Sequence, residues 1–386
     1  MKLIAQVKLH TTPEQLAALK LTMQSANRAC DYISSVAWEK KTFGQYALHK
    51  LVYQDVRKQF GLSAQVTVRC ISKVVDAYKL DKRRKRRFKS QGAITYDDRI
   101  LSWQMSHSQV SIWTMRGRIK IPFVCGDKQR ELLKTRQGEA DLILFRDHCY
   151  LSATCDIAAP EPFPSEGVLG IDLGVVNIAV DSDGHTYSGK TVRNVRYRHR
   201  RLRTKLQKKG TRSAKRLLKK LSGKEARFAK DVNHTISKQV VKLAQGTRRA
   251  IALEDLGGIR TRVTARRDQR ATLHSWSFFQ LCAFLEYKSK LAGVTVIAVD
   301  PRNTSRTCPV CGCVDKRNRP SQSRFSCVAC GYSGFADHIA ARNIASRAVV
   351  NPPNVACDEA KAVEVFSVST ELRSSTVTSH PLLAGV

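Results

Sequence analysis

The sequence has no long apolar run and few acidic residues for its length. No stretch approaches the roughly 20 consecutive apolar residues of a membrane-spanning helix, which excludes an integral helical membrane protein. The first residues, MKLIAQVKLHTTPEQ, alternate apolar and polar side chains and lack a small-residue cleavage site, so we expect no signal peptide. We therefore expect a soluble, cytoplasmic protein, and 386 residues suffice for two or three domains.

The scarcity of acidic residues gives the chain a large positive charge. It has 32 Asp and Glu against 67 Lys and Arg, a net charge of +35. Like charges on this scale repel one another and disfavour the compact state, so we expect a polyanionic partner. Nucleic acid fits best, through phosphate contacts and counterion release. A ribosomal-type structural role and charge used for solubility are the alternatives.

Two segments concentrate the basic residues. One is KLDKRRKRRFKS at 79–90; the other is 193–230, where 17 Lys or Arg accompany one acidic residue, Glu225. A solvated surface or a localisation signal is the alternative for the first run. With this net charge we expect phosphate contacts instead. The predicted nucleic-acid-binding residues are Lys82, Arg83, Arg84, Lys85, Arg86, Arg87, Arg198, Arg200, Arg201 and Arg203.

Hydrophobic periodicity divides the N-terminal half into strands and helices. MKLIAQVKL alternates as a strand does, and a helical pattern follows from an N-cap at Thr12 to about residue 80. Residues 90–158 hold short strand-like runs, typical of a small antiparallel sheet or barrel. We expect a β-barrel formed by 1–10 and 81–160, with a helical insertion at 11–80. The Pro-rich stretch APEPFPSEG, 159–167, predicts a domain boundary.

From residue 168 the pattern is that of an α/β domain. VLGIDL and AIALEDL are typical of buried strands, and NIAVDSDGHTYSG predicts a hairpin that turns at Asp183-Gly184. A long basic helical pair is expected over 191–245, broken near Gly210. A further helix, a strand and a last helix, DHIAARNIASRAV, complete this part. The tail 351–386 has no periodicity and is expected to be mobile.

Five of the twelve cysteines cluster between residues 308 and 330. The other seven are scattered and predict reduced core thiols. Two Cys-x-x-Cys hooks separated by fifteen residues can surround one tetrahedral Zn²⁺, with disulfides as the alternative. Four thiolates leave no open coordination position, so we expect a structural zinc, with Cys313 as a spare thiol. The predicted ligands are Cys308, Cys311, Cys327 and Cys330.

Three acidic residues lie either at the end of an apolar strand, where burying a carboxylate is costly, or at the start of a helix. Asp172 and Glu254 end apolar strands, and Asp337 opens the last helix. If they converge, they can bind Mg²⁺ or Mn²⁺ for phosphodiester hydrolysis. Taken singly, Asp337 can be only a helix cap and Glu254 can pair with a nearby base. Weaker candidates are Asp181, Asp183, Asp255, Asp300 and the packing residue His234.

A pattern for a nucleotide hydrolase also occurs. Gly184 to Thr191 read G-x-x-x-x-G-K-T, the motif of phosphate-cradling loops. Such a loop follows a buried strand and opens a helix directly. Here Asp183-Gly184 suits a hairpin turn, and HTYSG suits the returning strand. We therefore interpret the match as fortuitous.

The ordered motifs GIDLGVVNIAV, NHTISKQVV, ALEDLGG, NTSRTCPVCG, FSCVACG and ADHIAARNI resemble the TnpB proteins of insertion sequences, relatives of type V CRISPR effectors. The resemblance covers roughly 166–350. It implies an RNase H-like (RuvC) nuclease domain at 161–303 and 334–350, with an inserted zinc module at 304–333. It also implies that Asp172, Glu254 and Asp337 are the catalytic acids. The N-terminal half resembles the family in layout, as a wedge barrel carrying a recognition lobe.

The activity implied is that of an RNA-guided DNA endonuclease. Its partners would be a guide RNA from its own transposon end and double-stranded DNA with a short flanking motif, with one or two protein copies per RNA. A guided or zinc-dependent DNA-binding factor with little cleavage, and a compact type V CRISPR effector, are the alternatives. The sequence departs from the family's Asp-Ala-Asp-x-Asn motif, with Phe335 at the first acid and Ile339 at the Asn. Asn303 also stands where an aromatic residue is frequent.

Overall fold

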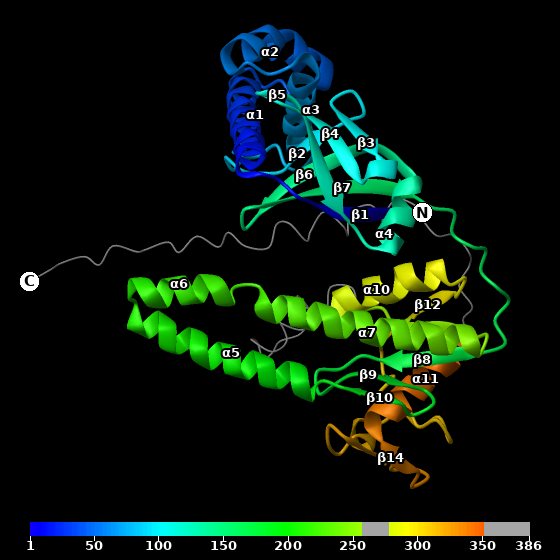
Figure 1. Ribbon diagram of the computed structural model, residues 1–386. Helices are drawn as coiled ribbons and strands as arrows, with labels where there is room; N and C mark the ends of the chain where they lie inside the picture. Colours follow the sequence, from blue (N-terminus) through cyan, green and yellow to red (C-terminus); the bar gives the residue numbers. More distant parts are fainter. Residues whose placement is uncertain (257–277, 351–386) are drawn as a thin grey trace, which may run out of the picture. The chain divides into compact units, whose positions relative to one another are not determined.

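The chain forms two compact units, Met1–Ala158 and Ala159–Val386, and each is described by itself. The computed structural model describes residues 1–256 and 278–350 (Figure 1). The predicted mobile tail at 351–386 lies outside the described residues. Within the described ranges, no helix has both the length and the apolar character needed to cross a membrane.

The first unit is built on a curled, barrel-like sheet of seven strands in the order β2-β6-β7-β1-β5-β4-β3. Every neighbouring pair is antiparallel, and the first strand of the chain pairs with β7 on one side and β5 on the other. The predicted first strand thus joins the later ones. The strands are β1 (Lys2–Leu9), β2 (Ile94–Tyr96), β3 (Leu101–Gln104), β4 (Gln109–Thr114), β5 (Gly117–Val124), β6 (Arg136–Phe145) and β7 (His148–Asp156).

Three helices lie between β1 and β2 in the chain. They are α1 (Pro13–Glu39), α2 (Gln45–Phe60) and α3 (Ala64–Leu80); η1 (Met105–His107) and α4 (Asp127–Lys134) follow later. Thr12 caps α1 and forms the predicted capping box with Gln15. The apolar face predicted for this helix is buried, with Met23, Cys30 and Ile33 fully inaccessible, and it shares one core with the sheet.

The second unit contains a mixed sheet of five strands in the order β10-β9-β8-β11-β12. The three strands that come first in the chain are antiparallel, whereas β8, β11 and β12 run parallel. The bounds are β8 (Val168–Asp172), β9 (Asn177–Asp181), β10 (Thr186–Ser188), β11 (Ala250–Glu254) and β12 (Val296–Val299). The hairpin predicted at Asp183-Gly184 is present, but its turn spans 182–185 because the Asp181 carboxylate accepts the backbone N–H groups of Asp183 and His185.

Helices cover both faces of this sheet. On one face, α7 (Lys224–Gly246) and α10 (Phe278–Leu291) pack on Leu169, Ile171 and Leu253. On the other face, Ile344 and Ala348 of α11 (Ala336–Val350) pack on β11 and β12. The sheet is therefore the middle layer of three, which explains why β8 and β11 are apolar up to their last residues, Asp172 and Glu254. The remaining elements, η2 (Lys316–Asn318), β13 (Arg324–Ser326) and β14 (Ser333–Phe335), belong to the cysteine-rich segment.

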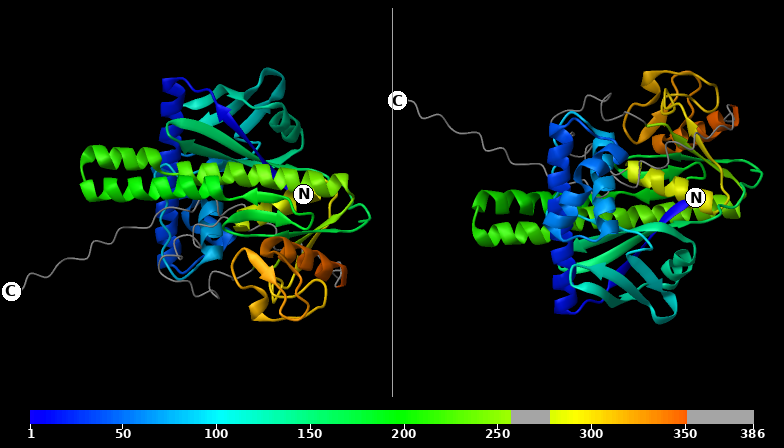
Figure 2. Two further views of the ribbon diagram at one scale, coloured as in Figure 1. Left: turned by 90° about the horizontal axis from the view of Figure 1, so that it is seen from below. Right: turned by 90° about the horizontal axis from the view of Figure 1, so that it is seen from above.

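The basic segment after β10 forms three helices instead of the predicted pair. These are α5 (Lys190–Lys209), α6 (Arg212–Leu221) and α7, and α5 runs antiparallel to the other two in an arm that extends past the sheet of this unit (Figures 1 and 2). The predicted break near Gly210 is present, with φ of 64°. A second break falls at Gly223, whose φ is 79°. Both glycines adopt the left-handed conformation that other residues disfavour; Gly210 is the C-cap of α5, and Gly223, after the C-cap Ser222 of α6, is the N-cap of α7.

Gly170 allows α11 to approach β8 closely. A Cβ at this position would lie 2.1 Å from the Ala341 carbonyl oxygen and 2.6 Å from the Ala345 nitrogen, both backbone atoms of the helix. Gly170→Ala should therefore push α11 from the sheet and lower the stability of the unit by about 3 kcal/mol. Thermal unfolding measures the effect. Gly246→Ala is the matched control, because a Cβ there meets nothing within 4 Å; equal losses in both variants would contradict the packing argument.

Candidate active site

Two of the predicted acids end neighbouring parallel strands. Ile171 of β8 lies opposite Leu253 of β11, so Asp172 and Glu254 follow at the same edge of the sheet. The strands before them are buried, whereas both acids are half-buried. The carboxyl ends of parallel strands are the usual place for a site in an open α/β sheet.

The third acid reaches this edge from α11. Asp337 lies in the first turn of the helix, which packs across β8 at Gly170. Asn177, at the start of β9, donates from Nδ2 to the Asp337 Oδ2 at 3.0 Å. Asp337 is thus hydrogen-bonded to β9, the strand beside β8.

Glu254 and Asp337 lie close enough to Asp172 to perturb its ionisation. Burial, followed by the charges of Glu254 and Asp337, raises the pKa of Asp172 to about 7. Burial also raises the pKa of Glu254, against a hydrogen bond that the Thr304 hydroxyl donates to its Oε1. Two carboxylates with raised pKa values at one sheet edge, in a strongly basic protein, make this edge a candidate site for a cation.

These carboxylates do not form a closed ligand set by themselves. Within the described ranges, the groups whose ligand atoms all lie within 4.8 Å of one another are the four cysteines and the trio Asp181, Asp183 and His185. The oxygens of Asp172, Glu254 and Asp337 are spaced more widely. An ion of the size of Mg²⁺, which keeps several waters, suits an open arrangement of this kind better than a dehydrated ion would.

Arg319 is a site residue that the sequence did not reveal. Its Nη2 donates to the Asp337 Oδ1 at 3.1 Å, and its charge opposes the raised pKa values of both Asp172 and Glu254. Both oxygens of Asp337 are thus engaged, one by Asn177 and one by this guanidinium. Arg319 lies among several basic residues in DKRNRP, and nothing in the sequence distinguishes it from them.

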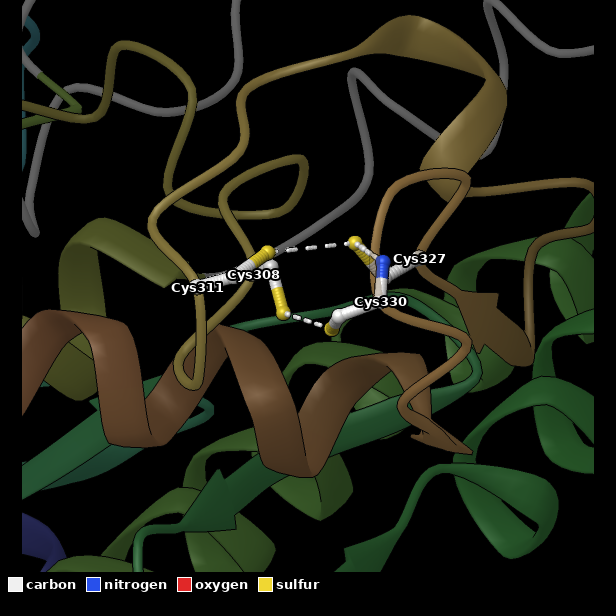
Figure 3. A group of neighbouring side chains, drawn as sticks. All are labelled: Cys308, Cys311, Cys327 and Cys330. Carbon is white, nitrogen blue, oxygen red and sulfur yellow. Dashed lines mark hydrogen bonds between the residues drawn. The ribbon is translucent and has the colours of Figure 1, made fainter.

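The four predicted cysteines meet in one cluster (Figure 3). The Sγ atoms of Cys308 and Cys330 are 3.6 Å apart, and those of Cys311 and Cys327 are 3.5 Å apart. A disulfide would require about 2.05 Å. Four thiolates at about 2.3 Å from a tetrahedral Zn²⁺ stand roughly 3.8 Å from one another, so the observed spacing fits the ion.

Each Cys-x-x-Cys hook has the same backbone geometry. Gly312 and Gly331, with φ of 71° and 73°, donate their N–H groups to the carbonyls of Cys308 and Cys327. Asn318 joins the two hooks: its Nδ2 donates to the Cys313 carbonyl, and its Oδ1 accepts the N–H of Val328. The Cys330 N–H donates to the Cys327 Sγ and lowers the pKa of that thiol to about 6, which favours the thiolate.

The weaker candidates have structural partners. Asp181 is fully buried and accepts two backbone N–H groups of its own turn. Asp183 accepts a two-pronged contact from Arg249, with one bond at 2.8 Å. His234 stacks on Phe284 with 3.9 Å between ring centroids, as expected of a packing residue. The close spacing of Asp181, Asp183 and His185 is therefore explained by the hydrogen bonds of the turn.

The predicted nucleic-acid-binding residues fall into two exposed groups, one in each unit. Residues 82–87 lie in the irregular segment between α3 and β2, and the four arginines at 198–203 lie on α5. Arg86 is half-buried and donates to the Asp81 carbonyl, so it also holds this segment in place. On α5, Arg201 lies over the exposed ring of Tyr197, and Arg203 pairs with Glu225.

The nucleotide-hydrolase pattern has the geometry of a hairpin. Its residues form the 182–185 turn, strand β10 and the start of α5. The Gly189 N–H donates to the Val176 carbonyl at 2.8 Å and is therefore not directed at a phosphate. This arrangement excludes a phosphate-cradling loop at this position.

Two family models match the chain. The model of a probable transposase, OrfB of IS605, matches residues 149–256. The Cas12f1-like TNB domain model matches residues 278–344. The first range includes Asp172 and Glu254, and the second includes Arg319, the four cysteines and Asp337.

Relatives that have been named are similar to the same part of the chain. The chain is 34% identical over 244 residues to the TnpB-like protein MJ0751 of Methanocaldococcus jannaschii, which covers 58% of this chain and 85% of the relative. It is 34% identical over 198 residues to the CRISPR-associated endodeoxyribonuclease Cas12f1 of Sulfoacidibacillus thermotolerans, or 46% of this chain and 45% of that one. It is 29% identical over 215 residues to the putative RNA-guided DNA endonuclease InsQ of Escherichia coli, covering 50% and 52%. The chain thus spans about half the length of the last two.

The fold also resembles a solved structure. A Cas12f1 chain in a complex with sgRNA and target DNA superposes with a TM-score of 0.54 at 15% identity. The match covers 84% of this chain and 82% of the other. At this identity the likeness concerns the multi-domain α/β fold with its barrel-like sheet.

Proposed function

Because this chain belongs to the TnpB family, we propose that it is an RNA-guided DNA endonuclease with an RNase H-like (RuvC) site that uses Mg²⁺ or Mn²⁺. The observation that carries the proposal is the convergence of Asp172, Glu254 and Asp337 at one edge of the mixed sheet. The barrel of the first unit would be the wedge domain, its helices 11–80 the recognition lobe, and 304–333 the zinc module.

The three carboxylates would hold the divalent cations. Bound there, such ions polarise a phosphodiester and lower the pKa of water. Asp172 supplies its full negative charge only above about pH 7, the pKa it has without the ion. Arg319 lies beside Asp337 and carries the positive charge that would meet the anionic oxygens of the scissile phosphate.

The zinc module would position Arg319 and Glu254. Arg319 follows η2 within the module, and Thr304, whose hydroxyl donates to Glu254, is its first residue. Asn343 of α11 donates to the Thr304 and Thr307 carbonyls at 2.7 and 2.8 Å. These hydrogen bonds hold the start of the module against α11, the helix that carries Asp337. Zn²⁺ at the four cysteines is thus assigned a structural role.

The proposed partners are a guide RNA and a double-stranded DNA target. The exposed basic groups at 82–87 and on α5 would bind phosphates, with the RNA supplied by the transposon end and a short motif flanking the target. The match to a Cas12f1-like domain favours a compact type V CRISPR effector as the second candidate. The two candidates share their chemistry and differ in the source of the guide.

Sequencing of the RNA that copurifies with the protein tests the proposal. Expression with the native flanking DNA should yield one discrete RNA that ends in a variable segment. DNA complementary to that segment should then be cut when Mg²⁺ is present and left intact in EDTA. Heterogeneous RNA, or a discrete RNA without metal-dependent cleavage, would favour the DNA-binding factor. Lys190→Ala should cleave like the parent protein, since Lys190 belongs to no phosphate loop.

A further inference from the structure

Phe335 is an aromatic residue with little protein around it. Its exposed fraction is 79%, the highest of the exposed large apolar side chains in the described part of the chain. Exposing an aromatic ring of this size to water is unfavourable, by an amount that scales with its apolar area. The family motif that this segment resembles has an acid at the position, so the ring is a property of this chain.

The β13–β14 hairpin explains where the ring points. Phe325 is fully buried in the small core with Cys308, Cys327 and Ile339, so its side of the hairpin faces the cysteine cluster. Side chains alternate along a strand, and directly opposed residues share a face. Phe335 lies opposite Arg324, and both are exposed, so the outer face of the hairpin presents an aromatic ring beside a guanidinium.

Phe335 lies close in the chain to one of the proposed active-site acids. Phe335 precedes Asp337 by two residues, so their Cα atoms lie within about 7 Å of each other. Asp337 is in turn bonded to Arg319. An exposed ring with an arginine beside it therefore lies two residues from an acid of the proposed cation site. A ligand that matches them carries an aromatic group next to an anionic group, as a nucleotide does.

We propose that Phe335 stacks on an unpaired base of the DNA strand that enters the carboxylate site. The inference rests on the proposed nuclease function and adds a substrate-positioning contact to it. Aromatic side chains stack on bases of any sequence, with Arg beside them contributing phosphate and cation–π contacts. The contact holds the strand and takes no part in bond breaking, so its loss should affect substrate binding more than turnover.

Target DNA with 2-aminopurine at single positions of the strand to be cut tests the contact. The protein–RNA complex is prepared in the Asp172→Asn background, in which the strand should remain intact. Base stacking should quench the fluorescence at one or two adjacent positions. Phe335→Ala should abolish this quenching, and Phe335→Trp should retain it. Val314→Ala, which trims another exposed apolar residue of the zinc module, should also retain it.

Cleavage by complexes with the intact site gives the second readout. Phe335→Ala should raise the KM for a short single-stranded DNA about tenfold and leave kcat nearly unchanged. Quenching that is equal in Phe335→Ala and its parent would overturn the inference, whether or not the protein cleaves DNA. Quenching that depends on Phe335 in a protein that cleaves nothing would support the stacking and contradict the nuclease. Phe335-dependent quenching in labelled guide RNA alone would overturn the assignment to DNA.

Discussion

Asp172→Asn should abolish DNA cleavage and at the same time stabilise the metal-free protein. The asparagine keeps the size of the side chain but removes the negative charge that would bind a cation. Because bound ions contribute several kcal/mol to transition-state stabilisation, we expect cleavage to fall more than about 1,000-fold. Binding of RNA and DNA should be nearly unchanged, since the exposed basic residues supply most of that affinity.

The stabilisation follows from the raised pKa of Asp172. Its pKa is about 7 in the fold, against 3.8 for the free side chain, so ionisation above pH 4 opposes folding. The penalty is absent below pH 4, grows as the pH rises and is complete above pH 7. At pH 8 it corresponds to roughly 2–4 kcal/mol after allowance for the half-buried position. Asp172→Asn removes it and should raise the Tm of the metal-free protein by several degrees.

Thermal unfolding at pH 5 and pH 8 in buffer without Mg²⁺ or Mn²⁺, and without a chelator that would remove zinc, measures this effect. Added Mg²⁺ should then stabilise the parent but not the variant. Asp183→Asn, in the β9–β10 turn of the same unit, is the matched control. The hydrogen bond from Arg249 lowers the pKa of Asp183, so its charge stabilises the fold above pH 4. Its removal should lower the Tm at pH 8 and leave cleavage intact. Destabilisation by both variants would contradict the assignment of Asp172 to a repulsive acidic cluster.

The parts of the site that the sequence predicts are those with local signals. Asp172 and Glu254 each end an apolar run, and parallel strands of one buried sheet bring such ends together. The clustering of the four cysteines follows from their spacing alone, because the geometry of a Cys-x-x-Cys-Gly hook depends on a few consecutive residues. The sequence alone therefore predicts both the convergence of the acids and the cluster of thiols.

Residues that contact the site only through the tertiary fold show no local sequence pattern that predicts them. Arg319 meets Asp337, and Thr304 meets Glu254, only because the chain between β12 and α11 returns to the sheet edge. The break at Gly223 was missed because the basic pattern continues through it, although its left-handed φ separates α6 from α7 there. The departure from the family motif at Ile339 also becomes intelligible: the side chain is buried against Cys308 and Cys327.

The small core of the zinc module explains why its metal should matter to the nuclease. Its buried apolar residues are few, and two of the five members of the cluster are themselves proposed zinc ligands. A segment of this size does not bury enough apolar surface to compensate for its loss of conformational entropy, so we expect metal binding to provide its folding energy. Both Arg319 and Thr304 depend on this segment for their positions.

Cys327→Ser should therefore remove zinc and cleavage together. Serine is a poor zinc ligand, so replacing the Cys327 thiolate leaves only three of the four proposed thiolate ligands. We expect zinc affinity to fall more than about 100-fold, and the Arg319–Asp337 contact to be lost as the module unfolds. Metal analysis of the purified protein should give one zinc per chain in the parent and a small fraction of that in the variant. The Tm of the main sheet should change much less, because its three layers have their own cores.

Cys313→Ser is the control that separates the metal from a general effect of thiol loss. Cys313 lies within the same segment, but it contributes its backbone carbonyl to Cys308 and Asn318, which serine preserves. This variant should keep its zinc and its cleavage. Equal zinc content in both variants would contradict the ligand set. Loss of zinc from Cys327→Ser with unchanged cleavage would instead show that Arg319 and Asp337 hold their positions without the metal, and the structural coupling proposed between the two sites would be wrong.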